Sequence, residues 1–192
     1  MAFFDQLKKQ AAAVAGAAGM PGQAAGAACK SETVAFADLP DTMDAFLSLP
    51  QAALATPYDT AAMTVVALCL YPADQALCYQ MLDYLRGPRP MNGMDRQFIS
   101  DRFRDKDYVP RSYFAGAVPG NDYTPTAPYT VTVRADPHSF DEQNLAKLFI
   151  VSGGADDPRP IKLRLATDGK WYLWEQYLLT AIRAPESSNP WA

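Results

Sequence analysis

Aromatic side chains near the C-terminal end of the chain are the first candidates for chemistry. Trp171 and Trp174 lie three residues apart in a segment typical of a β-strand, so they are expected on opposite faces. One should belong to the core, and the other can form the aromatic wall of a pocket; the alternative is sheet packing covered by a loop. The candidate binding residues are Tyr108, Arg111, Tyr113, Arg159, Trp171 and Trp174.

An enzymatic alternative rests on carboxylates and arginines that lie far apart in the sequence. Gathered by the fold, they would build an acid–base site in a cone-shaped pocket between a curved sheet and its helices. No recognised catalytic motif accompanies them, so the sequence leans away from an enzyme. The residues of this alternative are Asp101, Arg104, Arg111, Asp156, Arg159 and Glu175.

Histidine and cysteine do not form a pattern typical of a metal site. His138 is the only histidine, and its neighbour Ser139 is poorly placed for a nucleophile–base pair, so a surface turn is predicted. The three cysteines lack CxxC spacing, which argues against zinc and against a disulfide framework. The sequence therefore predicts no cofactor, no metal and a reducing compartment.

Two charged segments have both a functional and a structural interpretation. Residues 152–160 contain two glycines and Arg159, which could cradle an anion, but a hairpin connection is favoured because Asp156 and Asp157 would repel it. Residues 101–107 alternate acids and bases, which favours solvated ion pairs on a helix over binding of an anionic partner.

Composition excludes several classes of function. The chain has 192 residues, 49% apolar and 20% charged, with a net charge of −4, so a nucleic-acid binder is not expected. No stretch predicts a transmembrane segment, and the opening residues are a poor secretory signal, so the protein is expected in the cytoplasm.

The chain divides into two parts by composition. Residues 1–30 predict a flexible leader with a short amphipathic helix, which either docks weakly on a membrane surface or a partner, or frays without a role. Residues 31–192 are expected to form a single α+β domain.

The domain should place helices before strands. Helices are expected over residues 41–49, 61–70, 74–86 and 94–104. The second of these is apolar nearly all round, which indicates a central core helix capped by Asp59 or Thr60. A Tyr- and Pro-rich loop follows over residues 108–129 and is expected to be anchored by its aromatics.

Strand patterns fill the last third of the chain. They are expected over residues 129–134, 146–152, 160–165 and 170–175, with Asp168-Gly169 as a hairpin turn. This order predicts an α+β fold, with the N-terminal helices packed on one face of an antiparallel sheet of about four strands.

Several segments also resemble a known family. These are residues 49–63, 107–114, 121–125, 152–156 and 171–177, and residues 3–9 are similar to its variable leader. The family is an uncharacterised domain of unknown function seen in anaerobic Gram-positive bacteria, and the likeness covers about residues 34–192. The resemblance implies a bacterial cytoplasmic protein and assigns no activity, so no site residue is transferred from it.

The absent catalytic motif, the aromatic strands and the long loop together favour one function. The sequence predicts a non-enzymatic binding or protein-interaction module that uses an aromatic sheet face and the Tyr/Pro-rich loop. The partner would be an unknown protein or a small-molecule ligand. The small enzyme described above is the alternative.

Overall fold

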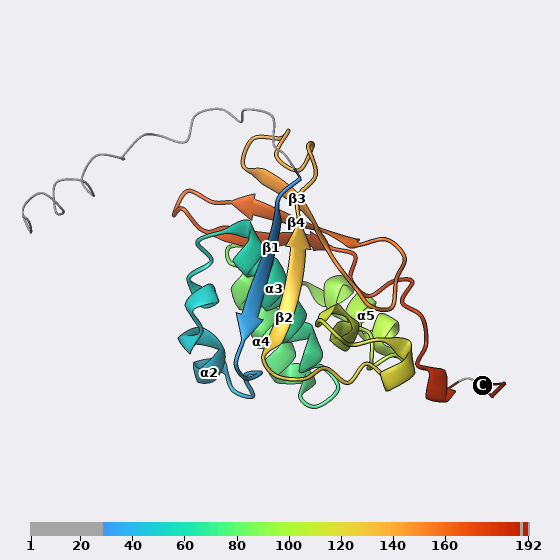
Figure 1. The fold of residues 1–192 in the computed structure, drawn as a ribbon. Helices are drawn as coiled ribbons and strands as arrows, with labels where there is room; N and C mark the ends of the chain where they lie inside the picture. Colours follow the sequence, from blue (N-terminus) through green and yellow to red (C-terminus); the bar gives the residue numbers. More distant parts are fainter. Residues whose placement is uncertain (1–28, 189, 192) are drawn as a thin grey trace, which may run out of the picture.

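A computed structural model describes residues 29–188, 190 and 191 (Figure 1). The helix predicted in the leader lies outside the described residues, apart from the last positions of that segment. No described helix is both long and apolar enough to cross a membrane. The helices are α2 (Met43–Ser48), α3 (Pro57–Cys69), α4 (Gln75–Arg86) and α5 (Gly93–Phe103). The strands are β1 (Ser31–Phe36), β2 (Tyr129–Arg134), β3 (Leu145–Ile150), β4 (Arg159–Leu165) and β5 (Trp171–Gln176).

The strands form one antiparallel sheet in the order β1-β2-β3-β4-β5. The predicted α+β class and antiparallel sheet are confirmed, and the sheet has five strands where about four were expected. The missed strand is β1, which buries only Val34 and Phe36. The apolar pattern of β1 is too short to distinguish a strand from a loop. The segment is recognised as a strand only from its pairing with β2, which lies almost 100 residues later in the sequence.

The sheet divides between β2 and β3. These strands share only two register pairs, Val133↔Ile150 and Arg134↔Phe149, whereas β1 and β2 pair along their whole length. Figure 1 shows β1 and β2 running at a steep angle to β3, β4 and β5. The long loop enters the gap, because Phe114 bridges Val131 and the Ala115 N–H donates to the Thr130 carbonyl at 2.9 Å.

Helix α3 lies against all five strands and forms the centre of the core. Its cap is Thr56, whose Oγ1 accepts from the Asp59 N–H at 3.1 Å. The prediction of Asp59 or Thr60 as the cap is therefore wrong. Pro57 can start the helix because the first helical N–H has no intrahelical partner in any case. The Thr60 hydroxyl instead donates to the Trp171 carbonyl at 2.7 Å and joins α3 to β5.

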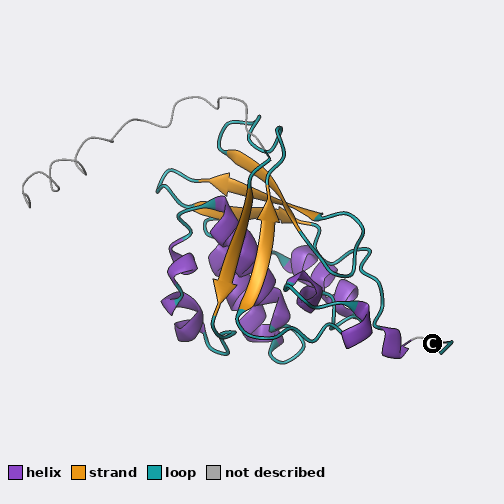
Figure 2. Ribbon diagram, viewed as in Figure 1, coloured by secondary structure: helices purple, strands orange, loops and turns teal. Residues whose placement is uncertain are grey.

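Helix α4 packs against α3 and the edge strand β5, and α5 lines a cavity together with α4 and β5 (Figure 2). Helix α4 buries Cys78, Met81, Leu82 and Leu85 and ends at Gly87, whose φ of 55° suits glycine. Helix α5 starts with a capping box between Asn92 and Asp95 and buries Ile99 and Phe103, whereas Phe98 stays 43% exposed. These two helices thus leave an aromatic ring beside the edge strand.

The Tyr- and Pro-rich loop is packed down by its tyrosines, as predicted. The Tyr113 hydroxyl donates to the Leu178 carbonyl at 2.6 Å, and the Tyr123 hydroxyl donates to the Arg183 carbonyl at 2.7 Å. Tyr108 stacks on Tyr123 with ring centroids 5.5 Å apart. The loop is therefore a structural layer that ties β2 to the segment after β5.

Candidate functional site

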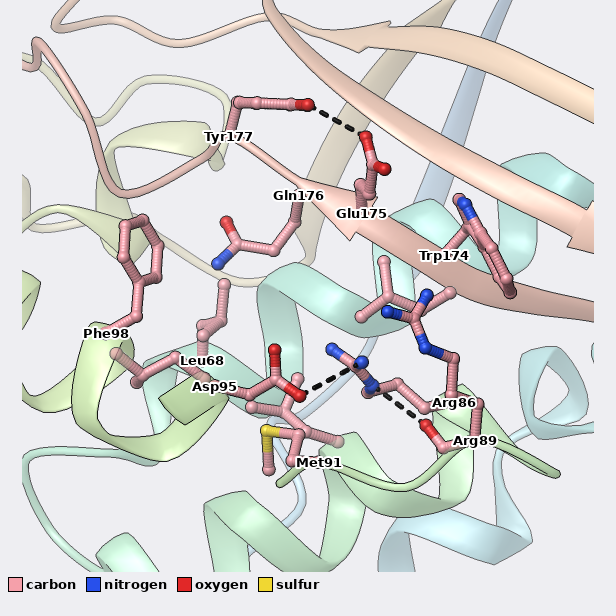
Figure 3. A pocket seen from close by; sticks show the side chains of 13 residues that line it. Leu68, Arg86, Arg89, Met91, Asp95, Phe98, Trp174, Glu175, Gln176 and Tyr177 are labelled. Atoms are coloured by element: carbon pink, nitrogen blue, oxygen red, sulfur yellow. Dashed lines mark hydrogen bonds and ion pairs between the residues drawn. The ribbon is translucent and has the colours of Figure 1, made fainter. Parts of the chain in front are cut away.

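A cavity of about 200 Å³ opens between β5 and helices α4 and α5 (Figure 3). Core side chains form its floor, and half-exposed aromatic and charged side chains form its rim. In Figure 3 the β5 side carries Trp174, Glu175 and Tyr177, and the helical side carries Phe98 and Arg89. The floor residues include Leu68, Leu82, Ile99 and Leu173.

Trp174 is the centre of a cationic cluster at one end of this cavity. The guanidinium carbon of Arg89 lies 4.3 Å from a Trp174 ring centroid, and that of Arg164 lies 4.7 Å away. A second recess of about 180 Å³ adjoins the first and includes both arginines and Trp174. Neither guanidinium forms a hydrogen bond or ion pair with a described residue. We call Arg89, Arg164 and Trp174 the Trp174 site.

A third arginine beside the site is already neutralised. Arg86 Nη2 lies 3.2 Å from Asp95 Oδ2, and the Arg86 Nε–H donates to the Arg89 carbonyl at 3.0 Å. The same Asp95 oxygen accepts from the Asn92 N–H in the α5 capping box. Arg86 therefore fixes the position of the chain at Arg89, and the positive field comes from Arg89 and Arg164.

Glu175 carries negative charge on the same β5 side of the rim as Trp174, where the charge of Arg89 also acts on it. Lys162 Nζ lies 2.8 Å from its carboxylate, and the Tyr177 hydroxyl donates to the same oxygen at 2.8 Å. These hydrogen bonds, that of Lys162 first, hold the pKa of Glu175 below its usual value. The group is therefore an engaged carboxylate at neutral pH, which is unsuited to act as a general acid.

A β-bulge explains why Trp174 lies at the rim. In the pairing of β4 with β5, Leu163 faces Leu173 and Lys162 faces Glu175, which leaves Trp174 as the extra residue. Trp171 packs against the core instead, and its backbone N–H donates to the Leu54 carbonyl at 2.9 Å. The two tryptophans thus have different surroundings.

The other predicted binding residues lie away from this cavity. Tyr108 and Tyr113 are buried, and both hold the long loop. The Arg159 guanidinium donates to the carbonyls of Thr180 and Ala181, which fixes the segment after β5. Arg111 is half-buried, and its Nε has no hydrogen-bond partner among the described residues. Of the six candidates, only Trp174 lines the cavity.

The carboxylates and arginines of the enzymatic alternative are distributed over separate places. Asp101 pairs with Arg104 at 3.2 Å on an exposed helix face, as expected for solvated ion pairs. Asp156, in the β3–β4 connection, pairs with Arg183 at 2.8 Å. Only Glu175 of that set lines the cavity. Within residues 29–188, 190 and 191, no three His, Cys, Asp or Glu side chains are grouped to hold a metal ion.

The glycine-containing segment after β3 is the predicted hairpin connection. The Gly153 N–H donates to the Ser112 carbonyl at 2.9 Å, and the Gly154 N–H donates to Ser152 Oγ at 3.1 Å. A Cβ on Gly153 would lie 2.0 Å from the Ala117 carbonyl oxygen, so glycine permits close packing on the long loop. These N–H groups are used inside the protein, which leaves them unavailable to cradle an anion.

His138 lies in an exposed turn, as predicted. Its Nδ1 lies 2.8 Å from Asp141 Oδ2, and the imidazole is 82% exposed. The neighbouring Ser139 hydroxyl contacts Asp136 rather than the imidazole. This group therefore has the geometry of a turn and not that of a nucleophile–base pair.

Arg89 and Arg164 are the site residues that sequence reasoning missed. Arg164 is directly opposite Tyr172 in the β4–β5 hairpin, so the Asp168-Gly169 turn signal was sufficient to place it beside β5. Arg89 follows Gly87-Pro88, which ends α4. No local sequence pattern connects Arg89 with Trp174, because strands β2, β3 and β4 lie between the two residues in the sequence.

Together these features define a class of α+β proteins in which a divided antiparallel sheet encloses a central helix and carries a cation-flanked tryptophan at its edge. The chain belongs to the family described as Domain of unknown function (DUF6935), whose model matches residues 38–186. The matched region contains the whole Trp174 site. Neither a curated protein nor a solved structure matches the chain.

Proposed function

We propose that the protein is a non-enzymatic binding module that holds a small organic anion at the Trp174 site. One observation carries the proposal: the guanidinium groups of Arg89 and Arg164 lie on the same indole ring, and neither forms a hydrogen bond or ion pair with a carboxylate of a described residue. Arginine is the side chain best suited to bind a carboxylate or phosphate group, because its planar fork donates two parallel hydrogen bonds.

The cavity defines the second part of the ligand. Its floor is apolar and its rim carries the exposed rings of Phe98 and Tyr177, so the uncharged part of the ligand would be an aryl or short alkyl group. The anionic group would lie beside Trp174, between Arg89 and Arg164. In this proposal the Tyr/Pro-rich loop acts as scaffold, because Tyr113 and Tyr123 are buried.

The proposal retains a bacterial cytoplasmic setting. Cys29, Cys69 and Cys78 are free thiols, which supports a reducing compartment. A protein partner is the second candidate, and the enzymatic alternative has less support because Glu175 is engaged by Lys162 and Tyr177.

Calorimetric titration of the full chain tests the anionic site. The probes are benzoate and phenyl phosphate, with benzyl alcohol as the uncharged analogue of similar size. Binding of the two anions and much weaker binding of the alcohol are expected. Arg89→Gln and Arg164→Gln should each weaken anion binding about tenfold or more, since a charged hydrogen bond contributes about 1.5–3 kcal/mol.

Arg104→Gln is the matched control, because Arg104 is exposed directly after the C-terminal end of α5 and lies outside both recesses. The Arg104→Gln variant should bind benzoate and phenyl phosphate with the same affinity as the unaltered protein. Equal binding of benzyl alcohol and benzoate, or equal losses in the Arg104 and Arg89 variants, would refute the proposal.

A further inference from the structure

The face of β3, β4 and β5 that points away from α3 carries an ordered set of side chains. Inner positions such as Leu148 and Leu163 are buried against the core, so the alternate positions lie on the opposite face. Figure 2 shows the helices gathered on the inner side of these strands. We call the alternate set the outer face; its members include Lys147, Phe149, Lys162, Arg164, Tyr172 and Glu175.

Two lysines lie directly opposite each other on this outer face. Lys147 of β3 pairs in register with Lys162 of β4, and Lys162 pairs in turn with Glu175 of β5. Like charges that face each other across a ladder destabilise a sheet. Glu175 compensates Lys162 at 2.8 Å, whereas Lys147 has no carboxylate partner among the described residues.

Arg164 adds a third cation to the outer face, two residues after Lys162 on the same strand β4. It is exposed, stacks on Trp174 at 4.7 Å and has no ion-pair partner in the part of the chain that the structure describes. Lys147 lies over the ring of Phe149 at 5.4 Å. The outer face thus alternates cations with aromatic rings, a combination that recognises acidic groups set among apolar ones.

The charge of this face is opposite in sign to that of the chain. The net charge is −4, whereas the outer face carries three cations; the carboxylates of Glu175 and Glu142 both act on Lys162, and neither Lys147 nor Arg164 forms an ion pair with a described residue. The local cations attract an acidic group, and the aromatic rings of Phe149 and Trp174 beside them suit a segment that also carries apolar side chains. Charge complementarity therefore favours a polypeptide with clustered acidic residues.

We propose that the outer face of β3–β5 docks an acidic segment of a partner protein, with Lys147 and Arg164 as the cations that the segment pairs. This surface is additional to the small-anion site, and Arg164 belongs to both. Lys147 lies two strands away from β5 and outside both recesses, so variants of Lys147 separate the two proposals.

Fluorescence polarisation with a labelled hexaglutamate peptide tests the proposal on the full chain. Binding is expected at low salt, should weaken as salt rises, and should be absent with a hexaglutamine peptide. Lys147→Glu should weaken binding about fivefold or more. The fold should be retained, because the new carboxylate faces Lys162 across the ladder.

Lys106→Glu is the matched control, since Lys106 is an exposed lysine in the connection after α5 and changes the net charge equally. An equal loss in both variants would show attraction by net charge alone and overturn the proposal. Tighter binding of anionic lipid vesicles or DNA, or self-association that Lys147→Glu abolishes, would also overturn it by assigning another occupant. Benzoate affinity unchanged in Lys147→Glu, together with lost peptide binding, would support it independently of the Trp174 site.

Discussion

The three cysteines differ in exposure and in acidity. Cys29 is exposed, Cys69 is half-buried and Cys78 is buried. Burial raises the pKa of the Cys78 thiol to about 12, with a further increase from Asp74. Burial also raises the pKa of the Cys69 thiol, although the nearby Arg111 cation opposes the increase. Because the thiolate is the reactive form, we expect the two inner cysteines to react more slowly than Cys29 in the folded protein.

We therefore predict that Cys29 alone reacts rapidly with a disulfide reagent in the native protein at about pH 8. All three thiols should react after unfolding in guanidinium, and the absorbance of the released thiolate measures both phases. Cys29→Ser should remove the fast phase. A rapid thiol remaining in that variant would mean that Cys69 or Cys78 is accessible, contrary to the packing of α3 and α4.

The candidate site was only partly predictable from residue types. The spacing of Trp171 and Trp174 indicated that the two rings diverge, but the bulge that places Trp174 at the rim depends on the pairing of β5 with β4. The spacing could not show that the two rings differ in their cationic neighbours. Arg89 reaches Trp174 from the α4–α5 connection, and this contact depends on where α4 ends relative to the sheet edge. The sequence pattern alone does not predict which residues of distant segments come into contact.

At the scale of elements, the cap at the start of α3 contributes to the stability of the fold. The Thr56 hydroxyl accepts from the Asp59 N–H at 3.1 Å and donates to the Asp59 carboxylate at 2.7 Å. This cap satisfies one of the free N–H groups at the start of the helix that contacts every strand. Loss of the cap should therefore lower the stability of the whole protein.

We predict that Thr56→Ala lowers the free energy of unfolding by about 1 kcal/mol. Urea denaturation followed by circular dichroism measures the change. Thr126→Ala provides the matched control at an exposed loop position, with an expected change within about 0.5 kcal/mol. Thr56→Ser should behave like the unaltered protein, because serine keeps the hydroxyl. Equal stabilities of the Thr56→Ala and Thr126→Ala variants would show that the cap contributes nothing.

Most elements were predictable because their signals are local. The strand over residues 129–134 was predicted with its exact bounds, and the helix ending at Arg86 was predicted to stop at Gly87. Two failures have non-local causes. Strand β1 acquires its identity from pairing with β2, and α3 starts earlier than expected because Thr56 and Pro57 together form a better start than Asp59.

For the whole molecule, the divided sheet bears on whether its two parts unfold together. Two register pairs alone connect β2 to β3, so hydrogen bonds across the ladder would hold the two parts of the sheet together weakly. Helix α3 contacts both parts, and Phe114, which is 1% exposed, bridges β2 at Val131 and packs in the same core. The connection between the parts is therefore made mainly by buried apolar side chains.

We predict that the whole sheet opens in one cooperative step, so amides of β2 and β4 should report the same unfolding free energy in native-state hydrogen exchange. Phe114→Ala should lower stability by about 3–5 kcal/mol and should raise exchange in β1 and β2 more than in β4. Leu47→Ala on the exposed side of α2 is the control and should leave both parts unchanged. Earlier exchange of β2 than of β4 in the unaltered protein would contradict a single cooperative domain, because it would show that α3 and Phe114 do not couple the two parts of the sheet.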